Sequence, residues 1–356
     1  MILVTGGAGF IGSNFIMNWL GLGKCPIVNL DKLTYAGNLN NLSSLANDSR
    51  YTFVYGDIGD RNLVRELLYK YQPFAVINFA AETHVDRSIY CPENFIQTNI
   101  LSSFNLIDEC LSYWKQLTPP QKESFRFVDI STDEVYGSLT SNDPPSKESA
   151  QFTPNSPYAA SKASFDHLVR AYHQTFALPV LTTHCSNNFG PFQFPEKLIP
   201  LVIVNALQGK PLPIYGDGMQ IRDWIYVNDH CEAINSVIEK GTPGSSYNIG
   251  HETKKTNLDI VKAICKLLDE LRPDSPYAPH EKLIEFIADR PGHDRRYALD
   301  AEKIKKELGW QPKETFDNGL RKTVTWYLDN QAWMNNILCG DYHAWIATHY
   351  NGAPGK

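Results

Sequence analysis

Thr5-Gly6-Gly7-Ala8-Gly9-Phe10-Ile11-Gly12 is the stretch that decides the fold, because an apolar strand-like run at 2–4 precedes it and a helical pattern follows it. Its glycines Gly6, Gly9 and Gly12 are spaced as in loops that bind dinucleotides. There the first glycine permits a tight turn, the second lets backbone approach a pyrophosphate, and the third packs helix on strand. The amino terminus of the helix offers unpaired N–H groups to the phosphates. The stretch predicts a dinucleotide site, although a glycine motif alone also fits an ordinary turn.

The acidic residue that such a site needs follows the second predicted strand. Residues 25–30 are mostly apolar and are predicted to form this strand. Asp31 follows them directly and lies 25 residues after Gly6. A carboxylate there can accept hydrogen bonds from both ribose hydroxyls of NAD and would repel a 2′-phosphate, so NAD is favoured over NADP. Lys32 beside it weakens this preference. The alternative is that Asp31 is only a turn residue.

Two further apolar runs, at 51–55 and 74–79, predict more strands of a parallel sheet. They are nearly continuous in apolar residues, as in strands that are covered on both faces. Helical patterns follow at 61–69 and 93–111. The alternation of strands and helices predicts an α/β fold with a doubly wound parallel Rossmann sheet.

Ligands of such a sheet gather at the carboxyl ends of its strands. Residues that follow the third and fourth strands, and one residue on the next helix, are therefore expected to line the adenine and the central part of the cofactor. These residues are Asp57, Ile58, Ala80, Ala81 and Thr98. His84 stays open between a hydrogen-bonded structural histidine and a ligand contact.

A helix-start signature places a tyrosine and a lysine together, with Ser156 as N-cap and Pro157 at the first helical position. Tyr158 and Lys162 are four residues apart on this helix, which continues to Phe176, so their side chains meet on one face. A tyrosine has a reference pKa of about 10 and acts as a base near neutral pH only beside a cation. Lys162 and a positive nicotinamide ring can supply that charge. The alternative is a core aromatic and a solvated lysine.

Two adjacent carboxylates, Asp133 and Glu134, follow Thr132 at the end of another apolar run at 125–130. Such a pair can serve as a general acid and a general base if burial and hydrogen bonding give the two groups different proton affinities. The alternative is a turn with two solvated acids.

The composition is that of an ordinary globular protein. Its 356 residues suggest two domains, and the formal net charge of −6 argues against a sequence-independent nucleic-acid binder. The seven cysteines lack metal-like spacing, so reduced thiols and no metal are expected. The first strand starts at Ile2, and no apolar run approaches the roughly 18 residues of a membrane span. We therefore expect a cytoplasmic protein that does not associate with membranes.

The pattern after residue 190 is less regular and predicts a smaller, interleaved α/β domain. A helix is expected after Lys197, strands at 213–218 and 222–227, a returning helix from Asp229, and an amphipathic helix at 258–271. The last helix would bury Ile260, Ile264, Leu267 and Leu271. We assign 1–190 to the dinucleotide-binding domain, with returning segments near 224–250, and mainly 191–356 to a discontinuous second domain.

Arg222 and Arg290 are candidates to bind a pyrophosphate, because a guanidinium fork matches phosphate oxygens with paired hydrogen bonds. The alternative for a lone arginine is a surface ion pair.

With these motifs, the chain resembles the extended short-chain dehydrogenase/reductase superfamily, and within it the dTDP-glucose 4,6-dehydratase family. The resemblance spans residues 2 to about 330. It rests on the glycine loop, on residues 31–38, 80–88, 131–137, 185–188 and 289–296, and on Tyr158 with Lys162. The pair Asp133 and Glu134 is diagnostic, since the related sugar epimerases have no use for a second acid and base.

The resemblance implies an NAD-dependent hydro-lyase that converts dTDP-glucose to dTDP-4-dehydro-6-deoxyglucose and water, for deoxysugar pathways such as that to dTDP-rhamnose. Tyr158 as phenolate would remove the C4 hydroxyl proton while hydride passes to NAD, and Thr132 would hydrogen-bond the same oxygen. Glu134 would take the C5 proton, and Asp133 would protonate the departing C6 hydroxyl. Because the hydride returns to C6, NAD would stay bound and be regenerated.

The residues and the resemblance together give a set of expected contacts. Those with NAD are Gly6, Gly9, Phe10, Ile11, Gly12, Asp31, Lys32, Leu33, Thr34, Asp57, Ile58, Ala80, Ala81, Thr83, Thr98, Tyr158, Lys162 and Asn188. Those with the nucleotide sugar are His84, Thr132, Asn187, Lys197, Leu198, Pro213, Ile214, Tyr215, Arg222, Asn257, Asp289, Arg290 and His293. The resemblance also implies a homodimer joined by the helices at 93–111 and 157–176.

The segment after Leu328 matches no function. Its aromatic residues Trp333, Trp345 and Tyr350 are expected to pack against the smaller domain.

Two other hypotheses stay open. A nucleotide-sugar 4-epimerase, or a dehydratase of another nucleotide sugar, would share the fold and the oxidation at C4. A non-catalytic NAD-sensing module that regulates a partner is disfavoured, because binding alone requires none of Tyr158, Lys162, Asp133 and Glu134.

Overall fold

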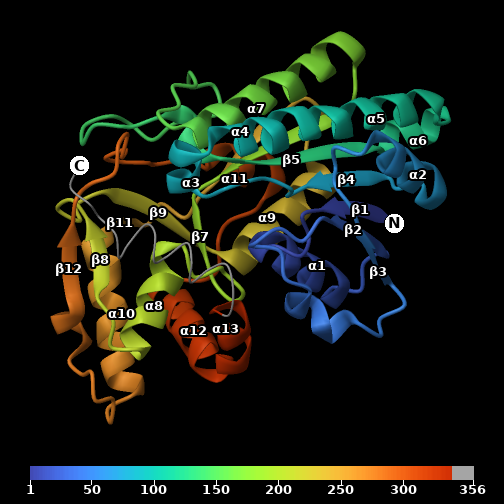
Figure 1. Cartoon of the computed structure of the whole chain (residues 1–356). Helices are drawn as coiled ribbons and strands as arrows, with labels where there is room; N and C mark the ends of the chain where they lie inside the picture. Colours follow the sequence, from blue (N-terminus) through green and yellow to red (C-terminus); the bar gives the residue numbers. More distant parts are fainter. Residues whose placement is uncertain (339–356) are drawn as a thin grey trace.

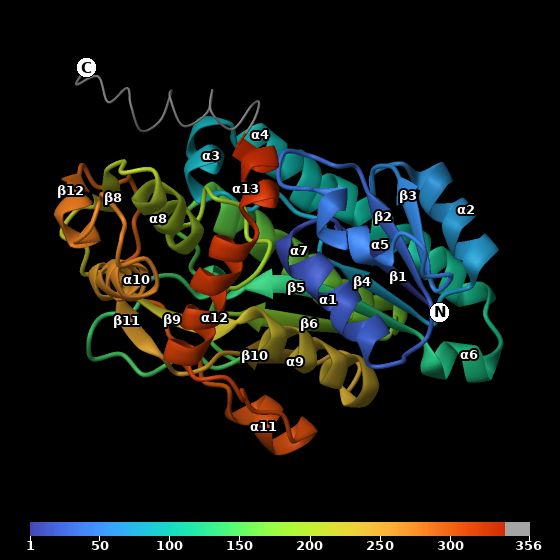
Figure 2. The same cartoon turned by 90° about the horizontal axis from the view of Figure 1, so that it is seen from below.

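The main sheet of the computed structural model, which describes residues 1–338, has seven strands in the order β10-β6-β5-β4-β1-β2-β3 (Figures 1 and 2). All neighbouring strands in it are parallel. The strands are β1 Ile2–Thr5, β2 Ile27–Asp31, β3 Tyr51–Tyr55, β4 Ala75–Asn78, β5 Arg126–Thr132, β6 Val180–Cys185 and β10 Ser246–Ile249. The predicted doubly wound α/β fold is confirmed.

Side chains of the strands alternate between two cores, one on each face of the sheet. In β1, Ile2 and Val4 belong to one core and Leu3 to the other, because successive side chains of a strand point to opposite faces. The first core is covered by α1 Phe10–Gly21, α9 Val227–Lys240 and α11 Glu302–Leu308. The second is covered by α2 Arg61–Tyr71, α5 Ser103–Gln116 and α7 Pro157–Phe176. Figure 1 shows α5 and α7 on the opposite side of the sheet from α1 and α9.

Two small sheets form much of the carboxyl-terminal half, with strand orders β11-β9-β7 and β12-β8. Their strands are β7 Asn187–Phe189, β8 Leu212–Tyr215, β9 Ile221–Tyr226, β11 Lys254–Thr256 and β12 Ile284–Ile287. The helices α8 Leu198–Leu207, α10 Asn257–Leu271, α12 Phe316–Asp329 and α13 Gln331–Leu338 share a separate apolar core (Figure 2). The chain returns between these parts, because β10 pairs with β6. The domain division at residue 190 stays a prediction.

The predicted helix at 93–111 is wrong in its middle. Short helices α3 Val85–Tyr90 and α4 Pro92–Phe95 lead into a π-helical turn, Ile96–Ser102, before α5 begins. Asn99 anchors this wide turn, because its amide accepts from the N–H of Glu82 and donates to the hydroxyl of Ser161, at 2.8 and 2.9 Å. Ile96 therefore stays 50% exposed and Leu101 48%. Apolar spacing alone could not reveal this polar anchor.

Smaller differences concern element ends and one helix face. α9 begins at Val227 rather than Asp229, and β5 continues to Thr132. In α10 the fully buried positions are Ile260, Val261, Ile264, Cys265 and Leu268, whereas Leu267 and Leu271 lie at the edge of the core. The buried face of α10 is therefore rotated around the helix axis relative to the predicted face.

The aromatic prediction for the last segment is confirmed where it can be followed. Trp333 packs on Phe192 and Trp326, and its ring N–H donates to Asn41 at 2.8 Å. Trp345 and Tyr350 lie outside the described residues. Among residues 1–338, no helix combines the length and the apolar character that crossing a membrane requires.

Candidate active site

A cleft lies at the carboxyl ends of β1, β2, β4, β5 and β6, and most of the predicted cofactor residues line it. The predicted residues in its wall are Gly6, Gly9, Phe10, Ile11, Gly12, Asp31, Lys32, Thr34, Asp57, Ile58, Ala80, Ala81, Thr83, Thr98, Thr132, Asp133, Glu134, Tyr158, Lys162, Asn187, Asn188 and Lys197. The lining of this cleft does not include Leu33, His84, Leu198, Pro213, Ile214, Tyr215, Arg222, Asn257, Asp289, Arg290 or His293.

The glycine loop leaves no room for a side chain at Gly6 or Gly12. A Cβ added to Gly12 would lie 2.5 Å from the carbonyl oxygen of Gly6, and Gly6 itself has a φ of +70°. The side chain of Asp31 ties this loop to β2, because it accepts from the N–H of Ala8 at 2.9 Å and of Leu33 at 2.8 Å. A close backbone cradle at the start of α1, beside a carboxylate, fits the pyrophosphate and ribose of NAD.

Leu33 and Lys32 act differently from each other in this cradle. Leu33 orients Asp31 through its amide rather than lining the cleft. Lys32 forms an ion pair with Asp57 at 3.0 Å and approaches the hydroxyl of Thr98 at 3.5 Å, so its charge is shared across the wall that follows β2 and β3.

Tyr158 and Lys162 occupy the first turns of α7, where the hydroxyl of Ser156 accepts from the N–H of Ala159 as the N-cap. Burial, followed by the charge of Glu134, raises the pKa of Tyr158 well above its usual value, while its hydrogen bond with Thr132 opposes the rise. Lys162 lies 3.6 Å from Asp129, with both side chains buried. A cation close to the hydroxyl would oppose the rise in the pKa of Tyr158 and favour its phenolate form.

Asp129 belongs to a chain of buried polar groups next to Lys162. Its other oxygen accepts from the amide of Asn78 at 2.9 Å, and Asn78 accepts from the hydroxyl of Thr5 at 2.7 Å. These contacts connect Thr5, at the start of the glycine loop, through β4 and β5 to Lys162.

Asp133 and Glu134 form a 3₁₀ turn, Asp133–Tyr136, directly after β5, and Thr132 caps it by accepting from the N–H of Glu134 at 3.3 Å. Asp133 is only 4% exposed, and its burial, with Glu134 and Asp223 nearby, raises its pKa well above the usual range. Burial also raises the pKa of Glu134, but the positive charges of Arg290, Lys197 and Arg222 oppose this rise. The two carboxyls therefore have different environments, with Asp133 favoured as the protonated one.

This difference has a measurable pH dependence. A general base works only when ionised, so we expect turnover to fall as the pH drops through the raised pKa of Glu134. In Lys197→Met one opposing positive charge is lost, so the acidic limb of the kcat profile should move to higher pH. Profiles of kcat against pH for both proteins test this, and superimposable acidic limbs would contradict the role of Lys197.

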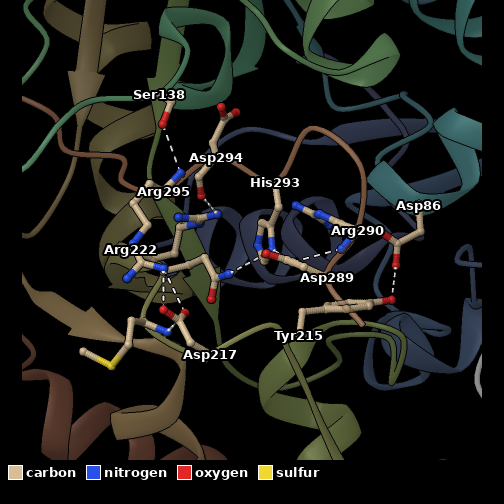
Figure 3. Close-up of polar contacts among 12 residues, drawn as sticks. Asp86, Ser138, Tyr215, Asp217, Arg222, Asp289, Arg290, His293, Asp294 and Arg295 are labelled. Atoms are coloured by element: carbon tan, nitrogen blue, oxygen red, sulfur yellow. Dashed lines mark hydrogen bonds and ion pairs between the residues drawn. The ribbon is translucent and has the colours of Figure 1, made fainter. Parts of the chain in front are cut away.

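The remaining predicted substrate residues do not line the cleft, and Figure 3 shows polar contacts made by several of them. Arg290 and Tyr215 both bind the carboxylate of Asp86, at 3.0 Å each. His293 contacts Asp289 at 2.6 Å, as Figure 3 shows. These pairs connect α3, β8 and the 289–293 loop.

Arg222 is more enclosed than a surface ion pair would be. It is 5% exposed, stacks on the ring of Tyr297 at 4.3 Å, and donates to the carbonyls of Ile221 and Asp294. Two of the guanidinium nitrogens of Arg222 are thus already engaged in hydrogen bonds within the protein.

His84 is 4% exposed and caps α3, because its Nδ1 accepts from the N–H of Arg87 at 3.4 Å. This contact gives it a structural task, and a contact with substrate stays a prediction.

Glu196 is a cleft residue that the sequence did not reveal. It accepts from the hydroxyl of Tyr35 at 3.0 Å, and burial raises its pKa to about 7. Arg87 stacks on the Tyr35 ring at 3.7 Å and lies 3.6 Å from Glu196. Glu196 immediately precedes Lys197, where a helix was predicted, and no local pattern indicates that it is buried against Tyr35, 161 positions away.

Asn188 was predicted to contact NAD, and it does line the cleft. Its amide is oriented by His230, whose Nδ1 lies 2.9 Å from its oxygen, and by the carbonyl of Ser186 at 3.0 Å. Within the described residues, no group of His, Cys, Asp and Glu side chains is arranged to hold a metal ion.

Comparison with known proteins gives a consistent result. The family model described as GDP-mannose 4,6 dehydratase matches residues 3–323. The dTDP-glucose 4,6-dehydratase of Xanthomonas campestris pv. campestris (strain B100) is 56% identical over 340 residues, which are 96% of each chain.

Solved structures agree in fold. A dTDP-glucose 4,6-dehydratase from Bacillus anthracis, solved in complex with NAD, is 45% identical with a TM-score of 0.83, covering 94% of this chain and 99% of that one. The UDP-glucose 4-epimerase of Thermotoga maritima reaches a TM-score of 0.80 at 28% identity, covering 93% of this chain and 99% of that one. The fold is thus shared with epimerases, whereas the higher identity is with the dehydratase.

Proposed function

The chain belongs to the dTDP-glucose 4,6-dehydratase family, and on this premise we propose that it converts dTDP-glucose to dTDP-4-dehydro-6-deoxyglucose and water. The observation that carries the proposal is the different surroundings of the two adjacent carboxyls in one cleft. Burial raises the pKa of Asp133 well above its usual range, whereas the positive charges of Arg290, Lys197 and Arg222 oppose the rise in the pKa of Glu134. An oxidation at C4 alone would need neither group.

Three residues take part in the oxidation at C4, namely Tyr158, Thr132 and Lys162. Tyr158 takes the proton of the C4 hydroxyl, and Thr132, which hydrogen-bonds Tyr158, orients the same oxygen. Lys162, held by Asp129, keeps a positive charge near the phenolate that forms. NAD, when bound, accepts the hydride from C4 and later returns it to C6.

The elimination is carried out by Asp133 and Glu134 of the 3₁₀ turn Asp133–Tyr136, which we call the acid–base turn. The 4-ketone acidifies the C5 hydrogen, which Glu134 removes as a base. Asp133 then gives its proton to the departing C6 hydroxyl, and water leaves.

Two groups of residues would hold the ligands. The glycine loop, Asp31, Asp57, Ala80, Ala81 and Thr98 would bind NAD, since they line the cleft around the start of α1. Asn187 and Lys197 would contact the sugar nucleotide from the opposite wall, and Arg222, Arg290, Tyr215 and His293 would approach its diphosphate and base from the surrounding segments.

One assay tests the reaction. The protein is incubated with dTDP-glucose in deuterated water, and the sugar is examined by NMR. We expect a 4-keto-6-deoxy product with deuterium at C5. A galactose configuration with the C6 oxygen retained would indicate an epimerase, and unchanged substrate would favour the binding module or another nucleotide sugar.

We further propose that the protein is a cytoplasmic homodimer that feeds deoxysugar synthesis. Half-exposed apolar side chains support the predicted contact, namely Ile96 and Leu101 before α5 and Phe176 at the end of α7. Burial of such side chains between two copies would stabilise a dimer. Sedimentation equilibrium tests this, and a monomer at micromolar concentration would contradict it.

A further inference from the structure

A buried chain of hydrogen bonds connects α7, which carries Tyr158 and Lys162, to the acid–base turn. Asp166, also on α7, accepts from the hydroxyl of Ser131 at 2.8 Å and lies 3.2 Å from Nε2 of His184. The other ring nitrogen of His184 lies 3.2 Å from the hydroxyl of Tyr136, which donates to Asn248 at 2.9 Å. None of these five side chains contributes to the chemistry described above.

The members of this network come from distant parts of the sequence. Ser131 lies on β5, His184 on β6, Asn248 on β10, and Tyr136 closes the acid–base turn. All five are buried, and the Phe152 ring packs on Tyr136 and His184 at 5.4 and 5.6 Å. Both contacts of Asp166 go to its Oδ2, and its Oδ1 has no hydrogen-bond partner among the described residues. The hydrogen bonds that are made restrict the movement of the side chains they join.

The donors and acceptors fix the protons of the network. The amide nitrogen of Asn248 donates to the carbonyls of Ser146 and Asp300, so its oxygen must face Tyr136. The hydroxyl of Tyr136 donates its only hydrogen to that oxygen. It can therefore only accept a hydrogen bond from His184. Oδ2 of Asp166 already accepts from the hydroxyl of Ser131. The contacts of His184 with Asp166 and Tyr136 are both hydrogen bonds if the ring donates through both of its nitrogens.

The position of the network matters because the sheet stops before the turn. β5 pairs with β6 as far as Thr132, opposite Cys185, so the ladder holds Thr132 in place. The next residues, Asp133 and Glu134, lie beyond the ladder. Thr153 donates to the carbonyls of Val135 and Tyr136, and Val135 packs with Ala163 of α7. The side chain of Tyr136 adds hydrogen-bonded contacts with His184 of β6 and Asn248 of β10.

We propose that Ser131, Asp166, His184, Tyr136 and Asn248 form a positioning network that holds the acid–base turn at a fixed place relative to Tyr158. The oxidation at C4 and the elimination at C5 and C6 then act on one sugar without its release. The proposal rests on the proposed function, and it assigns these residues to the elimination step in particular.

Single-turnover kinetics separate the two steps. The near-ultraviolet absorbance of reduced nicotinamide rises with oxidation at C4 and decays with hydride return after elimination. In Tyr136→Phe we expect the rise at its wild-type rate and a decay slower on the order of tenfold to a hundredfold, as for displaced catalytic groups. Ser131→Ala, at the other end of the network, should have the same selective effect.

A matched control removes a hydroxyl from the same helix. Tyr172 of α7 donates to Asp108 of α5 at 2.9 Å and packs in a different apolar cluster from Tyr136, so Tyr172→Phe should leave both phases unchanged. Equal slowing of rise and decay in Tyr136→Phe, or the selective effect in Tyr172→Phe, would overturn the proposal. Absence of any rise in the wild-type protein would instead refute the proposed function.

The protonation of His184 gives a readout that is independent of turnover. In protein labelled with ¹⁵N at histidine, His184 should show two protonated ring nitrogens. A single protonated nitrogen would contradict the arrangement of the network.

Discussion

Tyr158→Phe is expected to lower turnover of dTDP-glucose by about 10²- to 10⁴-fold, the usual contribution of a general base. The ring keeps its place against Phe95 at 6.3 Å, so the change removes only the hydroxyl. Without that hydroxyl nothing takes the C4 proton, and the hydride cannot leave. Stopped-flow absorbance should therefore show no reduced nicotinamide on mixing the variant with substrate.

The same variant must still bind its ligands if Tyr158 acts chemically. Calorimetric titration with dTDP should give the wild-type Kd, and thermal melting should show an unchanged fold. Full formation of reduced nicotinamide by Tyr158→Phe would mean that another group, such as Glu134, is the base for C4.

Glu134→Gln should stop the reaction at a different stage. Tyr158, Thr132 and Lys162 remain, so oxidation at C4 proceeds and reduced nicotinamide accumulates on the protein. The amide cannot take the C5 proton, and we expect water loss to slow by about 10²- to 10⁴-fold. Absorbance of the bound nicotinamide and quantified 4-keto-6-deoxy product measure the two stages.

Asp133→Asn provides the comparison within the same turn. It should also let oxidation proceed, but because Glu134 is intact, exchange of the C5 hydrogen with deuterated solvent should continue without water loss. Glu134→Gln should show no such exchange. Elimination at the wild-type rate in Glu134→Gln would disprove the role of Glu134.

Short sequence patterns predicted correctly the elements whose conformation depends on neighbouring residues. The loop from Thr5 to Gly12, strand β3 and the N-cap Ser156 of α7 occur where the sequence placed them, because each depends on neighbours within one turn or strand. Asp133 and Glu134 could be placed together because they are adjacent and follow a strand.

Contacts between distant segments were beyond such patterns. Asn99 widens its helix through partners on Glu82 and Ser161, and Glu196 is enclosed by Tyr35 and Arg87. Asp166 and His184 resemble ordinary helix and strand residues until the fold brings them below the acid–base turn. The proton affinities of Asp133 and Glu134 likewise depend on residues from three distant segments, at 197, 222–223 and 290–294.

The central claim is that one site oxidises, dehydrates and reduces the same sugar. Substrate deuterated at C4 tests it most directly, by NMR of the product formed in ordinary water without added NAD. We predict that the deuterium is found at C6, with hydrogen from solvent at C5. Deuterium retained at C4, or lost to free nicotinamide or solvent, would contradict the account.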